Sequence, residues 1–475
     1  MTALTERSAL ELARAIREQE VSALEVVEAH IGRLQDTSDR VNALAADRFE
    51  QARVEAAQAD QRVRAEAAAE LPPLLGVPFT IKETIALAGM PQSAGLVARR
   101  DYRSSATAPV ITRLTDAGAI PLGVTNTSEL TLWIESENRI YGRTNNPYDA
   151  SRAAGGSSGG EGAAVGSGGS PFGVGSDIAG SIRVPAMFCG VFGHKPSPGL
   201  IPNAGMYPPT PGEAARMLQV GPLTRRGTDL MPLLRLMAGP DADDPYSQEM
   251  ALGDPEGLSV DGLQVTTVED ASLLPFSREL RDARERAVGA LVAAGAHVRR
   301  VSLRSWRHAL LPYLVTLQVG AGSSTRALLE ESGEPAPTLR GLMARGGPHT
   351  LATRLTLAAE LMPPPSGQRQ EKLLRAGREL GAEVIDAIGD GVLLHPAHPR
   401  VAPKHGRTVG RSWLLTPAAV FNLAGVPVTE VPLGLTDSGL PLGVQVAAGP
   451  GRDHVSIAVA LELERVFGGW VPPPA

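Results

Sequence analysis

The sequence predicts an α/β fold in which helices are layered on a large sheet. Short apolar strands alternate with amphipathic helices along most of the 475 residues, an order typical of layered α/β proteins. The chain exceeds the roughly 250–300 residues of one ordinary hydrophobic core, so one large elaborated core or several domains are possible. No internal repeat and no long polar linker interrupts the alternation, which favours a single domain over residues 1–475.

Helices are predicted at the start of the chain. Residues 8–11 and 22–25 both read SALE, the serine-to-glutamate spacing of a capping box that opens a helix. Apolar residues recur at helical spacing behind each box, so each helix should bury one face. A third helix, rich in Ala, Glu and Arg, is predicted over residues 49–68. Residues 1–70 are therefore expected to form an N-terminal helical region.

Buried strands are predicted from short apolar runs bounded by Gly and Pro. They are expected at residues 74–81, 119–125, 171–176, 263–268, 297–303, 391–396, 426–433 and 442–448. The segment of residues 306–365 departs from this pattern because it is helical with Gly and Pro breaks. It is expected to be a lid or cap within the domain rather than a domain of its own.

Composition and charge narrow the class of protein. Asp and Glu number 51 against 45 Lys and Arg, a net charge of −6, which argues against nucleic-acid and anionic-membrane partners. The single cysteine, Cys189, excludes an intrachain disulfide and any site that needs several cysteines. The start of the chain lacks a signal-peptide pattern, and no apolar run reaches ~20 residues. We therefore expect a soluble, cytoplasmic protein without a membrane span.

Lysine is rare, which draws attention to the lysines that are present. Only four of the 45 cationic residues are lysines, at positions 82, 195, 372 and 404. Arginine keeps its proton in proteins, whereas lysine can lose it where its surroundings lower its pKa. A reaction that needs a basic amine could therefore use only these four positions.

Residues 155–185 form the densest Gly/Ser stretch of the chain. Apolar residues recur through it at core-like intervals, which disfavours a flexible linker. It contains neither a dinucleotide-binding G-x-G-x-x-G motif nor a P-loop. Residues 156–160 satisfy G-x-S-x-G, the nucleophile elbow of α/β-hydrolases, but this short pattern arises easily in glycine-rich sequence and no HGGG-type loop accompanies it. A catalytic serine of another kind stays open as an interpretation.

Several motifs taken together resemble the amidase signature family of serine amidohydrolases. The resemblance covers nearly the whole chain, and residues 71–230 hold its core motifs. It implies the amidase signature fold, a large twisted mixed β-sheet covered by helices on both faces. The motifs include GVPFTIKE at residues 76–83, GVTNTSEL at 123–130, GGSSGG at 155–160, GSDIAGSIRVP at 175–185, CGVFGHKPSPGLIP at 189–202 and FNLAGVPVTEVPLGL at 421–435.

The resemblance implies a catalytic triad of two serines and a lysine, without histidine, metal or cofactor. It assigns the nucleophile to Ser181, the base to Lys82, and the proton-bridging serine, held through a cis peptide, to Ser157. It places the oxyanion hole at four consecutive backbone N–H groups, those of Ile178, Ala179, Gly180 and Ser181.

Further residues around this triad are expected to support it. Ser158, Ser176 and Asp177 are predicted to hold the catalytic groups through hydrogen bonds, and Arg183 to pair with an acid. Ala179 departs from the glycine that is common in the family. Alanine keeps the backbone N–H donor, but a positive φ would be costly there.

The chemistry of these residue types agrees with the implied roles. A serine hydroxyl is a poor nucleophile until a neighbouring base removes its proton. A lysine amine can do so only when neutral, which requires its pKa to fall from about 10.4 toward 7. Burial of Lys82 beside the apolar run VPFTI is the expected cause. Ser157 would then relay protons between Lys82 and Ser181.

The implied function is hydrolysis of a small-molecule carboxylic amide through an acyl-enzyme intermediate. The block GGSSGGEGA is most similar to the branch of fatty acid amide hydrolases and their bacterial relatives, which favours a hydrophobic or aryl acyl group. Leu132, Trp133 and Ile134 are expected to line the acyl pocket. Two alternatives stay open: a glutaminase subunit of a tRNA-dependent amidotransferase, and a catalytically inactive binding protein. A homodimer is possible.

Two smaller patterns also have competing interpretations. His395, His398 and His405 suggest a metal site, but nearby prolines preclude helical ligand spacing, so exposed loop histidines and no metal are expected. An apolar strip in residues 351–362 could either pack in the core or cover an acyl tunnel. The second interpretation predicts that specificity rises with acyl chain length.

Overall fold

The computed structural model describes residues 3–269, 275–335, 337–343, 346–362 and 364–474. Its strands are β1 Leu44–Asp47, β2 Pro78–Lys82, β3 Ile120–Thr125, β4 Glu137–Asn138, β5 Gly142–Arg143, β6 Phe172–Asp177, β7 Phe192–Lys195, β8 Gln219–Thr224, β9 Gln264–Glu269, β10 His297–Ser302, β11 Val392–His395, β12 Val428–Leu435 and β13 Pro441–Ala448.

The α-helices are α1 Ala9–Arg17, α2 Ala23–Val41, α3 Phe49–Ala65, α4 Pro109–Asp116, α5 Gly159–Gly166, α6 Arg183–Cys189, α7 Leu230–Met237, α8 Arg278–Ala293, α9 Leu310–Ala321, α10 Thr325–Glu331, α11 Leu339–Met343, α12 Leu351–Ala359, α13 Gly367–Ile388, α14 Thr416–Ala424 and α15 Asp453–Phe467. Short 3₁₀ turns are η1 Leu4–Glu6, η2 Val97–Arg99, η3 Glu129–Thr131, η4 Gly212–Met217, η5 Gly227–Asp229, η6 Arg304–His308 and η7 Ser412–Leu415.

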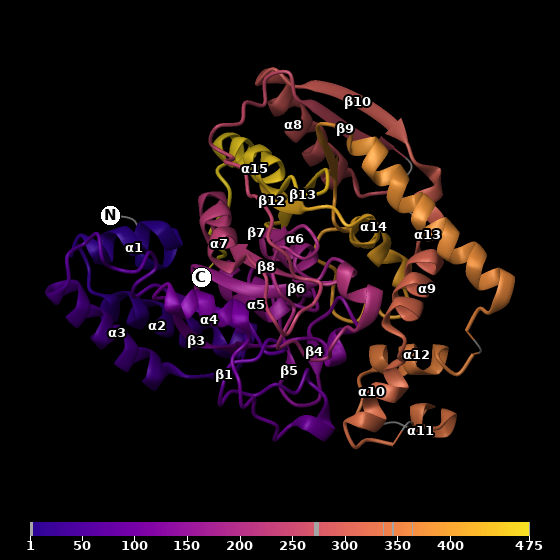
Figure 1. Ribbon diagram of the computed structural model, residues 1–475, viewed down its shortest axis with the longest axis horizontal. Helices are drawn as coiled ribbons and strands as arrows, with labels where there is room; N and C mark the ends of the chain where they lie inside the picture. Colours follow the sequence, from indigo (N-terminus) through magenta and orange to yellow (C-terminus); the bar gives the residue numbers. More distant parts are fainter. Residues whose placement is uncertain (1–2, 270–274, 336, 344–345, 363, 475) are drawn as a thin grey trace.

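Within the described residues, eleven strands form one mixed sheet in the order β1-β3-β2-β6-β8-β7-β12-β13-β11-β9-β10. In Figure 1 the sheet runs from β1 near the bottom to β10 at the top. Strands β2, β3 and β6 are parallel, as are β9, β10 and β11, and the strands between these groups pair antiparallel. The large mixed sheet confirms the predicted fold class.

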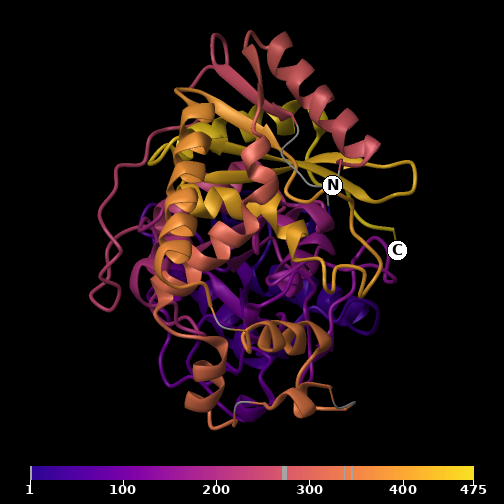
Figure 2. The ribbon, with the colours of Figure 1, turned by 90° about the vertical axis from the view of Figure 1, so that its right-hand side faces the viewer.

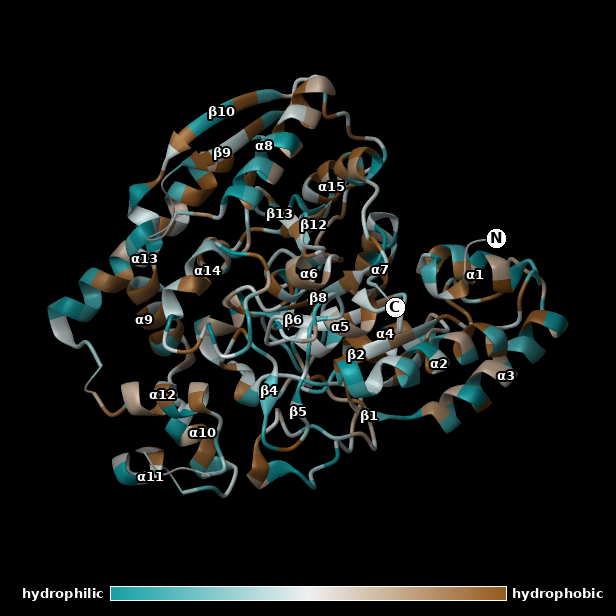
Figure 3. Cartoon of the chain, turned by 180° about the vertical axis from the view of Figure 1, so that it is seen from behind, coloured by the Kyte–Doolittle hydropathy of each residue, from teal (hydrophilic) through white to brown (hydrophobic). Residues whose placement is uncertain are grey.

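Helices cover both faces of this sheet (Figures 1 and 3). Helix α15 packs on β12 and β13 with α7 and α8 beside it, and α6 packs on the same two strands with α5 beside it. Side chains alternate across β11: Val392 and Leu394 join the larger core, whereas Leu393 joins a second core with Trp306 and Val384. This two-residue period follows from the pleat of a strand.

The N-terminal elements agree with the sequence. Both capping boxes are present, each with reciprocal hydrogen bonds between the serine and the glutamate three residues later. The third helix, α3, ends at Ala65, three residues before the predicted end. All three helices lie together at one side of the molecule, coloured indigo in Figure 1.

Every predicted strand is present, but β1, β7 and β8 were not predicted. Strand β8 reads QVGPLT, and its glycine and proline suggest a turn when they are read locally. The sheet explains the glycine, because a Cβ on Gly221 would lie 2.2 Å from the carbonyl oxygen of His194. Close approach of a neighbouring strand is a tertiary fact that the local sequence does not reveal.

The segment predicted as a lid contains η6 and α9 to α12. Helix α9 packs against η4, α13 and α14, whereas α10 to α12 lie beyond them, at the bottom of Figure 2. Leu329, Leu342 and Leu357 of this outer part pack on Leu96 and Leu130 of the main body. The apolar strip is not a core-packed face, because its other large residues are exposed: Leu351, Leu355, Leu361 and Met362.

A buried histidine also joins the outer helices to the main body. His349 Nδ1 lies 2.5 Å from a carboxylate oxygen of Glu129, and its Nε2 lies 3.2 Å from Glu334. Among the helices formed by the described residues, none combines the length and the apolar character that crossing a membrane requires. Figure 3 shows hydrophilic and hydrophobic residues interspersed along the outer helices.

Candidate active site

Lys82 is the last residue of β2 and its side chain is fully buried. Its Nζ lies 2.6 Å from Ser157 Oγ and 3.0 Å from Ser176 Oγ. The preceding strand residues include Phe79 and Ile81, which are also fully buried, because β2 lies in the interior of the sheet. The apolar run that the sequence shows before the lysine thus provides its buried position.

Burial lowers the pKa of Lys82 to about 7, although the nearby carboxylates of Asp177, Glu161 and Glu83 favour its charged form. Burial also raises the pKa of Glu161 to about 8, although Thr80 and Thr125 donate hydrogen bonds to its carboxyl. At neutral pH a largely protonated Glu161 exerts little pull on the ammonium form of Lys82. A neutral lysine is therefore available near pH 7.

The Gly156–Ser157 peptide is cis, in agreement with the resemblance. The carbonyl oxygen of Ser157 accepts hydrogen bonds from Thr127 Oγ1 at 2.9 Å and from Ser136 Oγ at 3.0 Å. A Cβ on Gly156 would lie within 2.9 Å of backbone atoms of residues 133–135. The backbone of this segment therefore closes off the side of the cis peptide and admits only glycine at position 156.

Ser158 and Ser157 have different surroundings. Ser158 Oγ donates to the carbonyl oxygen of Ser176 at 3.2 Å and accepts from its N–H at 3.3 Å. It thus ties the start of α5 to β6, whereas Ser157 Oγ is the hydroxyl that contacts Lys82. This difference supports the assignment of the bridging role to Ser157.

A small cavity of about 30 Å³ connects Ser157 with Ser181. Its other walls come from elements far apart in the sequence: Thr131, Ser176, Ile178, Met206, Pro208, Thr210 and Leu218. Reasoning from the sequence missed Thr131, Met206 and Leu218, because no motif or periodicity distinguishes these single residues in loops. The cavity is lined mainly by apolar side chains and serine or threonine hydroxyls.

The structure does not bring the three residues expected in the acyl pocket into the wall of this cavity. Leu132 packs beside the cluster that includes Leu96 and Leu357. Trp133 donates its indole N–H to Thr408 Oγ1 and lines a different hollow. Ile134 is buried behind the cis peptide. Their observed positions support the scaffold around Ser157.

Asp177 organises the loop that carries Ser181. Its carboxylate accepts hydrogen bonds from the N–H groups of Gly180 at 2.8 Å and Ile182 at 3.0 Å, and it forms a buried ion pair with Arg183 at 2.9 Å. Burial opposes ionisation, but the charge and hydrogen bonds of Arg183 hold the pKa of Asp177 far below its usual range. The carboxylate is therefore a fixed anchor for the loop.

The bond to Asp177 occupies the Gly180 N–H, one of the four predicted oxyanion donors. Across the described ranges, the N–H groups of Ile178, Ala179 and Ser181 have no protein acceptor. The positive φ of the loop is at Gly180, +107°, where a Cβ would also lie 2.5 Å from that of Ala418. Ala179 does not have a positive φ, so its departure from glycine is compatible with the loop.

The three C-terminal histidines are not assembled for metal binding. His395 and His398 are buried rather than exposed, which corrects the expectation of exposed loop residues. His395 packs edge-on against Trp306, and His398 Nδ1 contacts the carbonyl oxygen of Arg400. Among the residues that the structure describes, no cluster of three or more His, Cys, Asp or Glu could hold a metal ion.

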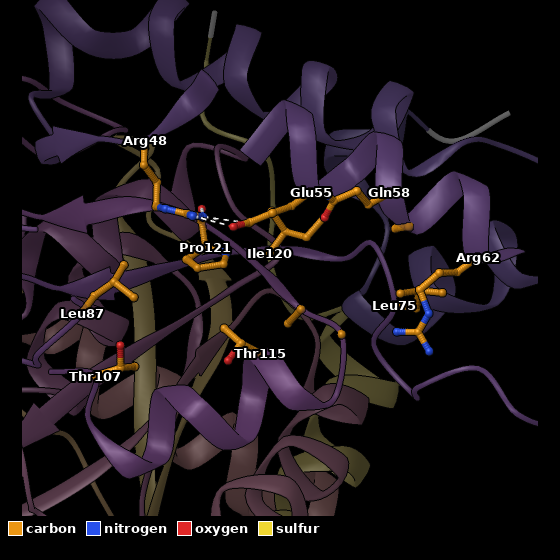
Figure 4. A pocket seen from close by; sticks show the side chains of 13 residues that line it. Arg48, Glu55, Gln58, Arg62, Leu75, Leu87, Thr107, Thr115, Ile120 and Pro121 are labelled. Atoms are coloured by element: carbon orange, nitrogen blue, oxygen red, sulfur yellow. Dashed lines mark hydrogen bonds and ion pairs between the residues drawn. The ribbon is translucent and has the colours of Figure 1, made fainter. Parts of the chain in front are cut away.

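A second hollow, of about 400 Å³, lies between α3 and α4 (Figure 4). Arg48 and Glu55 form a salt bridge at its rim, and Gln58, Thr107 and Thr115 line other parts of it. None of the predicted catalytic residues reaches this hollow. The chemistry therefore centres on the smaller cavity at Ser157 and Ser181.

Comparison with known proteins finds relatives over nearly the whole chain. The family described as Amidase matches residues 25–456. A fatty-acid amide hydrolase 2-A from Danio rerio is 41% identical over 494 residues, covering 98% of this chain and 90% of the relative. A glutamyl-tRNA(Gln) amidotransferase subunit from Methanosarcina barkeri is 33% identical over 410 residues, covering 83% and 85%. The solved 6-aminohexanoate cyclic dimer hydrolase complexed with substrate aligns with a TM-score of 0.83 at 26% identity, covering 98% and 97%.

Proposed function

The chain belongs to the amidase signature family and hydrolyses amide C–N bonds, and we propose that it does so with Lys82, Ser157 and Ser181. The contact of 2.6 Å between Lys82 Nζ and Ser157 Oγ, beside the cavity that Ser181 also lines, carries this proposal. It is tested by labelling the protein with a fluorophosphonate, which should modify Ser181 and abolish hydrolysis together.

Acylation begins with proton transfer along this chain of groups. Neutral Lys82 accepts the proton of Ser157, which accepts that of Ser181 as Ser181 Oγ attacks the carbonyl carbon of the amide. The N–H groups of Ile178, Ala179 and Ser181 stabilise the oxyanion of the tetrahedral intermediate. The C–N bond then breaks, and the proton returns from Lys82 through Ser157 to the leaving amine.

Deacylation repeats these steps with water in place of Ser181. Ser157 and Lys82 take a proton from the attacking water, and the same backbone donors stabilise the second oxyanion. Ser181 leaves with a proton, and the carboxylic acid is released. Net hydrolysis consumes one water and leaves the enzyme unchanged.

The proposed substrates are amides with hydrophobic or aryl acyl groups. Ile178, Met206, Pro208 and Leu218 give the cavity apolar walls beside the two serines. The 41% identity to a fatty-acid amide hydrolase 2-A over 98% of the chain points in the same direction. Because the described cavity is small, a long acyl chain requires the lid helices to move, and this role of residues 306–365 is part of the proposal.

The acyl preference is expected to exceed about tenfold in kcat/KM for octanoyl or benzoyl amides over acetamide. Each methylene buried against apolar walls contributes about 0.8 kcal/mol, so two suffice for a tenfold difference. The measurement is a series of amides with one common amine and acyl chains of increasing length. A flat series would contradict an apolar acyl site.

The relationship to a glutamyl-tRNA(Gln) amidotransferase subunit supports a second candidate, glutamine hydrolysis for a partner enzyme. Glutamine added to the same series separates the two candidates, since a glutaminase would prefer it to every apolar amide. An inactive binding protein would hydrolyse none of these amides and would resist fluorophosphonate labelling. The homodimer and the cytoplasmic location stay predictions, to be tested by analytical ultracentrifugation and cell fractionation.

The rate is expected to depend on pH through Lys82. Since burial lowers the pKa of this amine to about 7, kcat/KM should fall about tenfold per unit below pH 7 and level off above it. The sign follows from the mechanism, because only the neutral amine accepts a proton. A profile measured with an amide that carries no titratable group would reveal this limb, and full activity at pH 5 would contradict it.

A further inference from the structure

The loop that carries Ser181 is held from its outer side. Four of its backbone carbonyl groups, which face away from the cavity, accept hydrogen bonds from other parts of the protein. The donors are Asn422 for Asp177 at 3.2 Å, Tyr313 for Ile178 at 2.7 Å, Val184 for Gly180 at 2.8 Å and Ser158 for Ser181 at 3.3 Å. These bonds set the orientation of the peptide planes that present N–H groups.

Tyr313 is distinctive among these donors because it comes from α9, 135 residues from the loop. Its side chain is 2% exposed and packs with Met217, Ala419, Ile178 and Ala179. Burial raises the pKa of Tyr313 well above its ordinary value, so the hydroxyl keeps its proton and acts as a donor. It plays no part in the proton transfers described above.

The bond to Ile178 acts on one particular peptide unit. The carbonyl of Ile178 and the N–H of Ala179 belong to the same trans peptide and point in opposite directions. A donor fixed on the carbonyl therefore fixes the direction of the N–H. It also polarises the peptide, which strengthens the N–H as a donor.

We propose that Tyr313 is a positioning residue that aims the Ala179 N–H at the oxyanion of the tetrahedral intermediate. This inference rests on the proposed function, since it takes Ser181 as the nucleophile. It adds a residue from α9, within the segment predicted as a lid, to the machinery around that nucleophile. Tyr313 itself contacts neither the substrate nor the reacting atoms.

Ala179 is expected to share this task. Turning the Ile178–Ala179 peptide over would carry Ala179 toward a positive φ, which a residue with a Cβ disfavours. In an Ala179→Gly variant this backbone restraint is gone, and the hydroxyl of Tyr313 alone opposes the rotation. The two residues should therefore be coupled, so that loss of the hydroxyl costs more when position 179 is glycine.

The experiment measures kcat and KM for Tyr313→Phe, Ala179→Gly and the double variant. Removal of a complete oxyanion donor costs about 10²–10³ in kcat, and a misaimed donor should cost part of this. We expect kcat to fall about tenfold in Tyr313→Phe and about a hundredfold when the same change is made in Ala179→Gly. KM should stay within about twofold, because the amide ground state places little charge at this position.

A second readout separates positioning from a general loss of structure. An acyl trifluoromethyl ketone adds to the serine and places an oxyanion in the hole, whereas the product carboxylic acid does not. In Tyr313→Phe the affinity for the ketone should fall by the same factor as kcat/KM, and the affinity for the product should not change. Tyr313→Met, which keeps apolar volume without a hydroxyl, should show the same division.

Tyr148→Phe is the matched control. Tyr148 is also buried and donates its hydroxyl to a backbone carbonyl, that of Val471, but it does not line the cavity. It should lose a similar amount of thermal stability and keep its kcat. Unchanged kcat and ketone affinity in Tyr313→Phe, or equal losses for ketone and product, would overturn the inference. Failure of fluorophosphonate to label Ser181 in the unmodified protein would instead overturn the proposed function.

Discussion

Replacing Ser181 with alanine is expected to lower kcat on the order of 10⁵-fold, to the background of the assay. The backbone donors and the cavity remain in this variant, but no oxygen is left to form the acyl-enzyme. Substrate binding should survive, because alanine removes only one hydroxyl from a cavity lined largely by other residues. Hydrolysis of the best amide in the acyl series, together with mass spectrometry of the trapped acyl-enzyme, measures the loss.

Ser167→Ala is the control for this experiment. Ser167 is a buried serine next to α5 whose hydroxyl donates to the carbonyl oxygen of Ala164, and it does not line the cavity. Its replacement should leave kcat within about twofold, the usual range for a change remote from the chemistry. Residual acylation in Ser181→Ala would reassign the nucleophile to another residue, with Ser157 as the next candidate.

Replacing Lys82 with arginine is expected to lower kcat by at least about 10³-fold, nearly as much as Lys82→Ala. Arginine preserves the positive charge but cannot release its proton, so it cannot accept one from Ser157. If the lysine acted only through its charge, arginine would restore much of the activity. The comparison of kcat between the two variants therefore distinguishes a base from a fixed cation.

A structural control accompanies the lysine variants, because Lys82 is fully buried. Lys82→Met keeps much of the apolar length of the side chain and should fold with a melting temperature at or above that of the unmodified protein, since it buries no charge. It should be as inactive as Lys82→Ala. An active methionine variant would show that Lys82 has no role as a base.

Much of the fold could be predicted from the sequence, because the strongest signals are local. The capping boxes of α1 and α2 involve residues three apart, and each predicted strand is a short apolar run. Strand β8 was missed because Gly221 serves a neighbouring strand rather than its own. His395 and His398 were misjudged because their flanking prolines suggest a loop, whereas aromatic rings and backbone from other segments bury them.

The sequence by itself determined which residues carry the chemistry: Lys82, Ser157 and Ser181 follow from motifs whose members are close neighbours in the chain. Only the tertiary structure decided that the Gly180 N–H is occupied by Asp177, that Met206 and Leu218 form cavity walls, and that Tyr313 holds the loop. The physical reason is range. A motif records side chains that one stretch of backbone presents together, whereas the aim of an N–H group depends on partners that folding brings from distant segments.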